Sequence, residues 1–94
     1  MEISICATFY SGKGHLNIII LHSDYKPQRY ESSGCYIFSL EPGEWEASLQ
    51  GVAPQGGVLV EVFDAREHLI GSKKISKEGT FNRFLKFKVP VSEI

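Results

Sequence analysis

The feature that most constrains this chain is the alternation of apolar and polar residues at every second position. In the segment 35–49, CYIFSLEPGEWEASL, the alternation continues on both sides of a Pro-Gly pair. Successive side chains of a strand point to opposite faces, so this segment predicts two strands joined by a tight turn. The predicted hairpin places four apolar side chains on the core, those of Phe38, Leu40, Trp45 and Leu49. No stretch of a dozen residues sustains the period of a helix, and we predict an all-β protein.

Turn signals divide the chain into seven short apolar runs. The predicted strands cover residues 2–10, 15–22, 35–40, 44–50, 58–65, 69–76 and 81–91, and residues 23–34 and 51–57 are predicted loops. Strand 15–22 is apolar on both faces, which suits the centre of a sheet, whereas the lysines of strand 69–76 suit an edge. The spacing is typical of a seven-stranded antiparallel two-sheet β-sandwich with Greek-key connections, and a small closed β-barrel is the alternative.

Length and composition predict a single domain, residues 1–94. A chain of 94 residues, 43% of them apolar and 22% charged, can form one hydrophobic core. The longest apolar run, residues 18–21, is too short to cross a bilayer, so we predict no membrane partner. The N-terminus MEISICATFY lacks the features of a signal peptide. We therefore expect a cytoplasmic protein by default, with an extracellular or periplasmic location left open for a mature form.

Charged residues are balanced overall but separated along the sequence. The net charge is -1, which gives no general attraction to nucleic acid, and we predict no nucleic-acid partner. Between residues 41 and 67 the acidic residues are Glu41, Glu44, Glu46, Glu61, Asp64 and Glu67, and between residues 71 and 88 the basic residues are Lys73, Lys74, Lys77, Arg83, Lys86 and Lys88. Two interpretations remain open, namely cross-strand pairs within a sheet or head-to-tail self-association.

The chain carries no strong motif for catalysis or metal binding. Cys6 and Cys35 lack the spacing of metal ligands, and we predict neither a metal nor another cofactor. The two cysteines are either buried thiols or a disulfide. Glu44 and Glu46 share one strand face and can approach within about 7 Å, a separation that suits acid–base chemistry on glycosides. An enzyme or enzyme accessory subunit that uses this pair or His22 is therefore an alternative to the noncatalytic protein that we predict.

The predicted loop 23–34, SDYKPQRYESSG, is the strongest candidate for a binding surface. Its candidate site residues are Tyr25, Lys26, Arg29 and Tyr30. Aromatic rings beside cationic groups favour recognition, because they offer a flat apolar surface together with charge. In the alternative interpretation, the two tyrosines fold back over the end of the sandwich.

The segment 34–45 also carries a pattern that is found in a known group of β-sandwich modules. The pattern residues are Gly34, Tyr36, Phe38, Leu40, Pro42, Gly43 and Trp45. They resemble the G-x-Y-x-F-x-L-x-P-G-x-Y hairpin of prealbumin-like and carboxypeptidase-regulatory-like modules. The resemblance covers about a dozen of the 94 residues, and it implies an immunoglobulin- or prealbumin-like sandwich without catalytic activity.

No functional residue is transferred from that family, because the G-x-V-x-D-x-x-G-x-P-L opening common to its members is missing here. The function that the resemblance and the loop together indicate is a noncatalytic interaction module. Its partner is predicted to be another protein or a second copy of the chain. A carbohydrate-binding accessory domain is the alternative.

Overall fold

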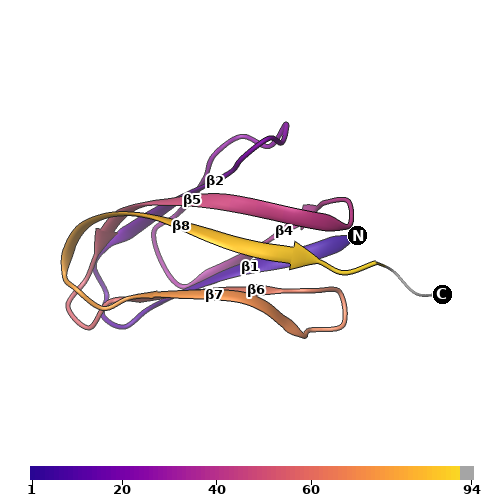
Figure 1. The fold of residues 1–94 in the computed structure, drawn as a ribbon. Coiled ribbons are helices and arrows are strands. Elements are labelled where there is room, and N and C mark those ends of the chain that lie inside the picture. Colours follow the sequence, from indigo (N-terminus) through magenta and orange to yellow (C-terminus); the bar gives the residue numbers. More distant parts are fainter. Residues whose placement is uncertain (92–94) are drawn as a thin grey trace.

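The computed structural model describes residues 1–91 and forms two antiparallel sheets (Figure 1). These residues form eight strands and no helix. The strands are β1 (Glu2–Phe9), β2 (His15–Ile20), β3 (Gln28–Tyr30), β4 (Gly34–Ser39), β5 (Gly43–Ala53), β6 (Val58–Phe63), β7 (Leu69–Ile75) and β8 (Gly79–Val89). Sheet A has the order β4-β1-β6-β7, and sheet B has the order β3-β2-β5-β8. The all-β prediction is confirmed. The predicted count of seven was wrong, because the segment 23–34 contains the additional strand β3.

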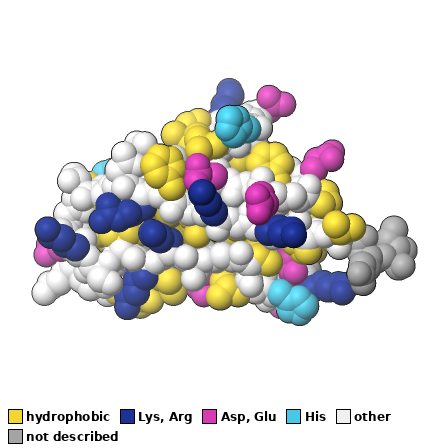
Figure 2. All heavy atoms as spheres, viewed as in Figure 1, with side chains coloured by type: hydrophobic (Ala, Val, Ile, Leu, Met, Phe, Trp, Pro, Cys, Tyr) yellow, Lys and Arg dark blue, Asp and Glu magenta, His cyan; other side chains and the backbone are white. Residues whose placement is uncertain are grey.

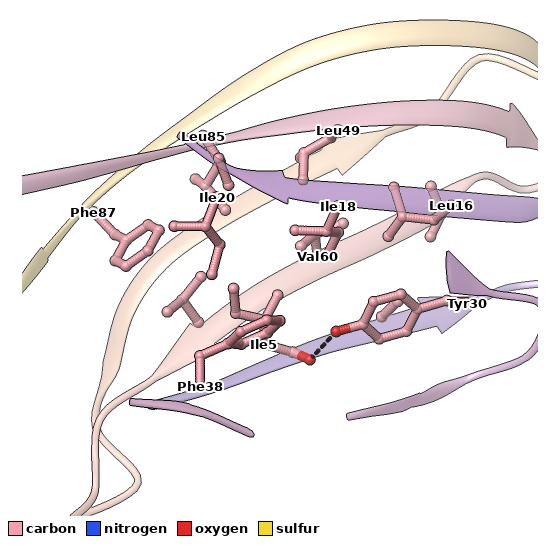
Figure 3. Close-up of a cluster of buried hydrophobic side chains, with 14 of the residues drawn as sticks. Ile5, Leu16, Ile18, Ile20, Tyr30, Phe38, Leu49, Val60, Leu85 and Phe87 are labelled. Atoms are coloured by element: carbon pink, nitrogen blue, oxygen red, sulfur yellow. Dashed lines mark hydrogen bonds between the residues drawn. The ribbon is translucent and has the colours of Figure 1, made fainter. Parts of the chain in front are cut away.

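The core lies between the two sheets. In β1 and β6 every second side chain is buried, including Ile5 and Val60, and these face the buried side chains of β2 and β5, including Ile18 and Leu49. Figure 3 shows the side chains of both sheets meeting in this core. Strand β2 lies between β3 and β5, as its two apolar faces predicted. None of the described residues forms a helix that is long and apolar enough to cross a membrane.

The strand order is nested. The β2–β3 hairpin lies in sheet B, while the strands that flank it in sequence, β1 and β4, pair with each other in sheet A. The second half repeats this arrangement in reverse, with the β6–β7 hairpin in sheet A and the flanking β5 and β8 paired in sheet B. The pairs β1–β6 and β2–β5 join the two halves.

The predicted hairpin over residues 35–49 was wrong. Strand β4 belongs to sheet A and β5 to sheet B, so the Pro42-Gly43 turn carries the chain from one sheet to the other. Gly43 has φ 138°, a backbone conformation that glycine adopts without a steric penalty. Of the four side chains that the alternation placed on the core, Phe38, Leu40 and Leu49 are buried, whereas Trp45 is only partly buried. The alternation could not indicate which strands are neighbours, since either arrangement buries the same face.

The two sheets approach each other along both sides of the sandwich but remain separately hydrogen-bonded. A Cβ atom on Gly71 of the edge strand β7 would lie 3.0 Å from the Cβ of Phe87 in β8, so no side chain fits between them. On the opposite side the rings of Tyr30 and Tyr36 meet edge to face with centroids 4.7 Å apart. The edge position predicted for strand 69–76 is confirmed by β7.

Cys6 and Cys35 form a disulfide on the outer face of sheet A. They lie directly opposite each other in the β1–β4 pair, with their Cα atoms 4.0 Å apart. The sequence left the state of these cysteines open. The structure shows the disulfide, which is possible because opposed residues of neighbouring strands direct their side chains to the same face of the sheet.

Candidate functional site

The structure places Tyr30, one of the predicted binding residues, in the core. Its side chain is 3% exposed, and its hydroxyl donates a hydrogen bond of 2.6 Å to the carbonyl of Ile5 (Figure 3). Burial raises the pKa of this hydroxyl, because the phenolate would lose its hydration. The ring therefore fills the space between β3 and sheet A and offers no surface to a partner.

Tyr25 is also engaged within the molecule. Its hydroxyl donates to the carbonyl of Ser39 at 3.2 Å and accepts from the N–H of the same residue at 2.7 Å. Its ring packs edge to face on Phe38 with centroids 5.1 Å apart. Both tyrosines thus fold back against the sandwich, which was the alternative interpretation of this segment.

Lys26 and Arg29, the other two predicted binding residues, are exposed. The Nε of Arg29 lies 3.1 Å from the carboxylate of Glu31, an exposed ion pair that stabilises the fold little. A binding role for the segment 23–34 stays a prediction, and it now rests on these two cationic side chains rather than on the tyrosines.

The outer face of sheet B presents an apolar row that crosses three strands. Ile19 of β2 lies opposite Ser48 of β5, and Ser48 lies opposite Phe84 of β8. Phe84 is 53% exposed, although three other large side chains of the same strand point into the core. Ser48 is only 5% exposed despite facing outward. We call Ile19, Ser48 and Phe84 the apolar row.

Polar residues border the apolar row on one side. Arg29 lies opposite Asn17, which lies opposite Gln50, and Gln50 lies opposite Asn82. These side chains share the outer face because directly opposed residues of an antiparallel pair point the same way. The side-chain amide of Gln50 donates to the hydroxyl of Ser48 at 3.3 Å. Gln50 therefore contacts Ser48, the central residue of the apolar row. We call Arg29, Asn17, Gln50 and Asn82 the amide row.

Two pairs of opposite charges border the apolar row on its other side. Glu46 lies opposite Lys86, and Glu44 lies opposite Lys88, across the β5–β8 ladder. This arrangement is the cross-strand interpretation of the separated charges, and it neutralises part of each segment. Figure 2 shows the acidic and basic side chains close together above β8, with further Lys and Arg side chains along β7 and β8.

A groove of about 760 Å³ lies at this charged end of sheet B. Its apolar lining includes Leu21 and Trp45, and its polar lining includes His22 and the Glu–Lys pairs. The indole N–H of Trp45 donates to the carbonyl of Glu41 at 2.8 Å, which holds the ring in place. His22 has φ 59°, a left-handed conformation that is uncommon for residues other than glycine. The residues of the enzymatic alternative, His22, Glu44 and Glu46, therefore lie at one groove.

Among residues 1–91 no group of three or more His, Cys, Asp or Glu side chains is close enough together to hold a metal ion. The outer face of sheet B carries the apolar row, the amide row and the two Glu–Lys pairs. These rows can bind a ligand or partner by apolar contact at the centre and by hydrogen bonds around it.

The fold and this face define the chain as a small antiparallel β-sandwich with an exposed aromatic residue on the edge strand β8 of one sheet. Comparison with family models, with curated proteins and with solved structures found no match to the chain.

The sequence contained a signal for the apolar row that the loop-centred prediction missed. Strand 81–91 buries the odd-numbered Phe81, Leu85 and Phe87, and Phe84 is an aromatic residue in the opposite, otherwise polar phase. Ile19 occupies the same out-of-phase position in its strand. Apolar residues on the solvent side of two strands indicate an exposed apolar surface only when the strands share a sheet, and that fact needed the topology.

Proposed function

We propose that this protein is a noncatalytic interaction module that binds a protein partner through the outer face of sheet B. The observation that carries the proposal is Phe84, an exposed aromatic side chain midway along the edge strand β8, with polar residues before and after it on the same face. Aromatic residues surrounded by polar groups dominate the binding energy of protein interfaces, because the polar rim excludes water from the apolar contact. Arg29, at the end of the amide row, is the other residue type enriched at such sites.

An immunoglobulin- or prealbumin-like relationship is part of the same proposal. It is supported by the segment 34–45, in which Phe38 and Leu40 are buried and Gly43 takes positive φ at the turn. The Cys6–Cys35 disulfide supports a location in an oxidising compartment, because disulfides persist where thiols are not kept reduced. The proposed module is therefore periplasmic or extracellular.

The test compares matched substitutions on the two outer faces. Phe84→Thr and Ile19→Thr remove the apolar row, whereas Ile37→Thr removes an exposed apolar side chain, 66% exposed, from the outer face of sheet A. Affinity capture from the source organism should recover a partner with the wild type and Ile37→Thr but not with the sheet B variants. Equal recovery by all four proteins would contradict the proposed face.

A carbohydrate-binding accessory domain is the second candidate, and the groove favours it. Trp45 offers apolar surface, while the carboxylates of Glu44 and Glu46 can accept hydrogen bonds from sugar hydroxyls. A glycan that binds the folded state raises the melting temperature by mass action, and Glu44→Gln or His22→Ala should reduce that shift. Hydrolysis of the bound glycan would favour the enzymatic alternative, whereas a panel that causes no shift would contradict the carbohydrate-binding proposal.

A further inference from the structure

The four charged side chains beside the apolar row are not ion-paired within the chain. Glu44 and Glu46 lie on the outer face of β5, and Lys86 and Lys88 lie opposite them on β8. Although each glutamate has a lysine as its ladder partner, none of the four side chains makes an ion pair or a hydrogen bond with any of residues 1–91. The outer face of sheet B therefore carries an acidic row on β5 beside a basic row on β8, and both rows can offer their charges to a partner.

The order of these two rows makes the face complementary to itself. A two-fold axis that lies in the plane of contact, between β5 and β8 and parallel to them, places β5 of each copy over β8 of the other. Every residue of β5 then faces its own ladder partner, but in the second copy. Glu46 thereby faces Lys86, and Glu44 faces Lys88. Because the symmetry repeats each contact, opposite charges meet at both ends of the axis.

We propose that the partner of the outer face of sheet B is a second copy of the chain, bound face to face about this axis. The inference rests on the proposed function, since it names the partner of that same face. Both copies use the same surface, so the contact closes as a dimer and leaves no such surface open for further copies. Complementary charges fix the orientation of the two copies, and apolar contact supplies most of the affinity.

Phe84 forms the apolar centre of this contact. The ring of each copy faces Ser48 of the other, and it lies between Ile19 and Phe84 of that second copy. Serine is the smallest side chain of the apolar row, so the ring enters a low point between two larger side chains. The contact covers Phe84, which is 53% exposed in the single chain, and brings two aromatic rings together.

Other orientations of the two faces bring like charges together. A two-fold axis that crosses the strands places β5 over β5 and β8 over β8, so glutamates face glutamates and lysines face lysines. An axis that runs along β5 itself also places the acidic row over its own copy. Like charges that face each other across an interface disfavour that orientation. The charges therefore select the axis between β5 and β8.

The connection between β2 and β3 leaves room for the second copy. Residues 21–27 rise from sheet B on the side away from sheet A (Figure 1). Because β5 separates β2 from β8, this connection stands beyond the β8 edge of the second copy and not between the two faces. Leu21 and His22 of the connection line the groove of about 760 Å³ together with both glutamates. The lysine side chains of the second copy extend into this groove to reach the carboxylates.

The area of the contact predicts a weak dimer. Three strands about 4.8 Å apart, with a residue about every 3.3 Å along β5 and β8, present a face of roughly 500 Å² in each copy. Two such faces reach the roughly 1,000 Å² that a specific interface requires, and we expect a dissociation constant on the order of micromolar. Added salt should raise this constant, because salt screens the attraction between the opposed rows.

The first experiment reverses one charge in each of two proteins. Glu46→Lys places an ammonium group over Lys86 of a second copy, and Lys86→Glu places a carboxylate over Glu46, so neither variant should dimerise with itself. In an equal mixture each altered residue faces an opposite charge at both contacts, and a mixed dimer should form. By sedimentation equilibrium we expect each variant alone to raise the dissociation constant at least about tenfold, and the mixture to return it to within about threefold of the wild type.

Mixing separates the contact between copies from the ladder within one chain. Each single variant opposes two like charges across its own β5–β8 ladder, and mixing cannot repair that change. Melting temperatures measured before mixing show that each variant is folded. Glu61→Lys, on the outer face of sheet A, is the matched control and should dimerise as the wild type does.

A second experiment uses a variant that keeps opposite charges in its ladder. The double variant Glu46→Lys with Lys86→Glu should dimerise with itself, because opposite charges again face each other between copies. It should not pair with the wild type, since like charges then meet at both contacts. Energy transfer between fluorescently labelled copies measures both pairings. Equal pairing of the double variant with itself and with the wild type would contradict the proposed axis.

The outcomes separate this inference from the function on which it rests. A wild type that stays monomeric at millimolar concentration, a dimer that neither charge reversal weakens, or folded variants that stay monomeric when mixed would each overturn the face-to-face dimer. If Phe84→Thr still abolishes capture of a different protein, the proposed function stands and only the identity of its partner is wrong. A mixed dimer restored by opposite charges supports the inference, and affinity capture should then recover the chain itself.

Discussion

One hydroxyl group ties the shortest strand of the molecule to the opposite sheet. Strand β3 has three residues, and its only buried side chain is Tyr30. The hydroxyl reaches across the sandwich to the carbonyl of Ile5 in β1, and the ring packs against Tyr36 of β4. Tyr30 therefore connects an edge strand of sheet B with two strands of sheet A.

Removal of that hydroxyl should destabilise the fold measurably. Tyr30→Phe leaves a buried carbonyl without its partner, and we expect a loss of about 1–2 kcal/mol in the free energy of unfolding. Tyr36→Phe is the control, because the hydroxyl of Tyr36 donates an exposed hydrogen bond of 3.3 Å to the backbone carbonyl of Arg29. Urea unfolding of both variants tests the prediction. Equal stability of the two variants would show that the buried hydrogen bond contributes nothing beyond an exposed one.

A carboxylate in the β6–β7 turn, that of Asp64, makes the free energy of unfolding depend on pH in the acidic range. The side chain of Asp64 is 8% exposed and accepts hydrogen bonds of 2.9 Å from the N–H groups of His68 and Arg66. These hydrogen bonds hold the pKa of Asp64 below its usual value, and the bond from the N–H of His68 has the largest effect. Burial of the carboxylate acts in the opposite direction. The ionised form therefore binds the native turn more strongly than the protonated form does.

The stability contributed by Asp64 should disappear in acid. Its lowered folded-state pKa means that the contribution is fully present above the unfolded pKa, near 3.9, and is lost as pH falls through the folded-state value. Asp64→Asn should thus be less stable than the wild type at neutral pH, and the difference should shrink below about pH 4. Thermal unfolding across pH measures it, with Asp24→Asn as the control for loss of an exposed carboxylate. A constant difference would contradict the linkage.

At the scale of elements, β5 is longer than its sequence pattern predicted. The pattern placed its end at Gln50 and a glycine-rich loop over 51–57, but the strand continues to Ala53. Gly51 pairs with both Leu16 and Phe81 in the middle of sheet B. A Cβ atom at this position would overlap the carbonyl of His15, so glycine is required by the close approach of β2. Composition alone cannot distinguish this role of glycine from a loop.

Substitution of Gly51 should disrupt sheet B. Gly51→Ala must push the β2 backbone away, and we expect a loss of more than about 2 kcal/mol or failure to fold. Gly34→Ala is the matched control, because a Cβ there meets no atom within 4 Å. Melting temperatures of the two variants test the difference, which should be at least about 10 °C. A well-folded Gly51→Ala would mean that β2 and β5 can separate without cost.

At the scale of the whole molecule, period-two alternation predicted the fold class and the buried faces but not the strand partners. Phe38 and Leu49 were correctly assigned to the core, yet their strands lie in different sheets. Burial of a side chain is a local property of the pattern, whereas pairing depends on distant segments such as β6. Strand β3 escaped detection because three residues are too few to display alternation.

The candidate site was less predictable than the fold. Residue composition indicated a tyrosine-rich loop, but tyrosine also packs well inside a protein when its hydroxyl finds a partner, as Tyr30 does. The apolar row depends on β2, β5 and β8 lying side by side, and these strands are far apart in sequence. Ile19 and Phe84 each resembled an ordinary exposed apolar residue until the register brought them together.

The disulfide should contribute much of the stability of the whole domain. Cys6 and Cys35 are 29 residues apart in sequence, and the loop that they close contains β2 and β3. Loss of such a crosslink increases the freedom of the unfolded chain, and we expect Cys6→Ser with Cys35→Ser to cost about 2–4 kcal/mol. Denaturant unfolding of this double variant and of the reduced wild type measures the effect. Unchanged midpoints would show that the β1–β4 pairing alone fixes this region.

The nested strand order has a consequence for the time course of folding. Strand β1 is synthesised first, but its second neighbour is β6, and the last strand, β8, completes sheet B beside β5. A growing chain therefore holds an apolar, half-paired β1 until residues beyond 58 have emerged. Folds dominated by such distant pairings form slowly, in milliseconds to seconds, because the chain must first lose much of its freedom. During that interval the disulfide partners, both in the first half, can already meet and hold β1 beside β4.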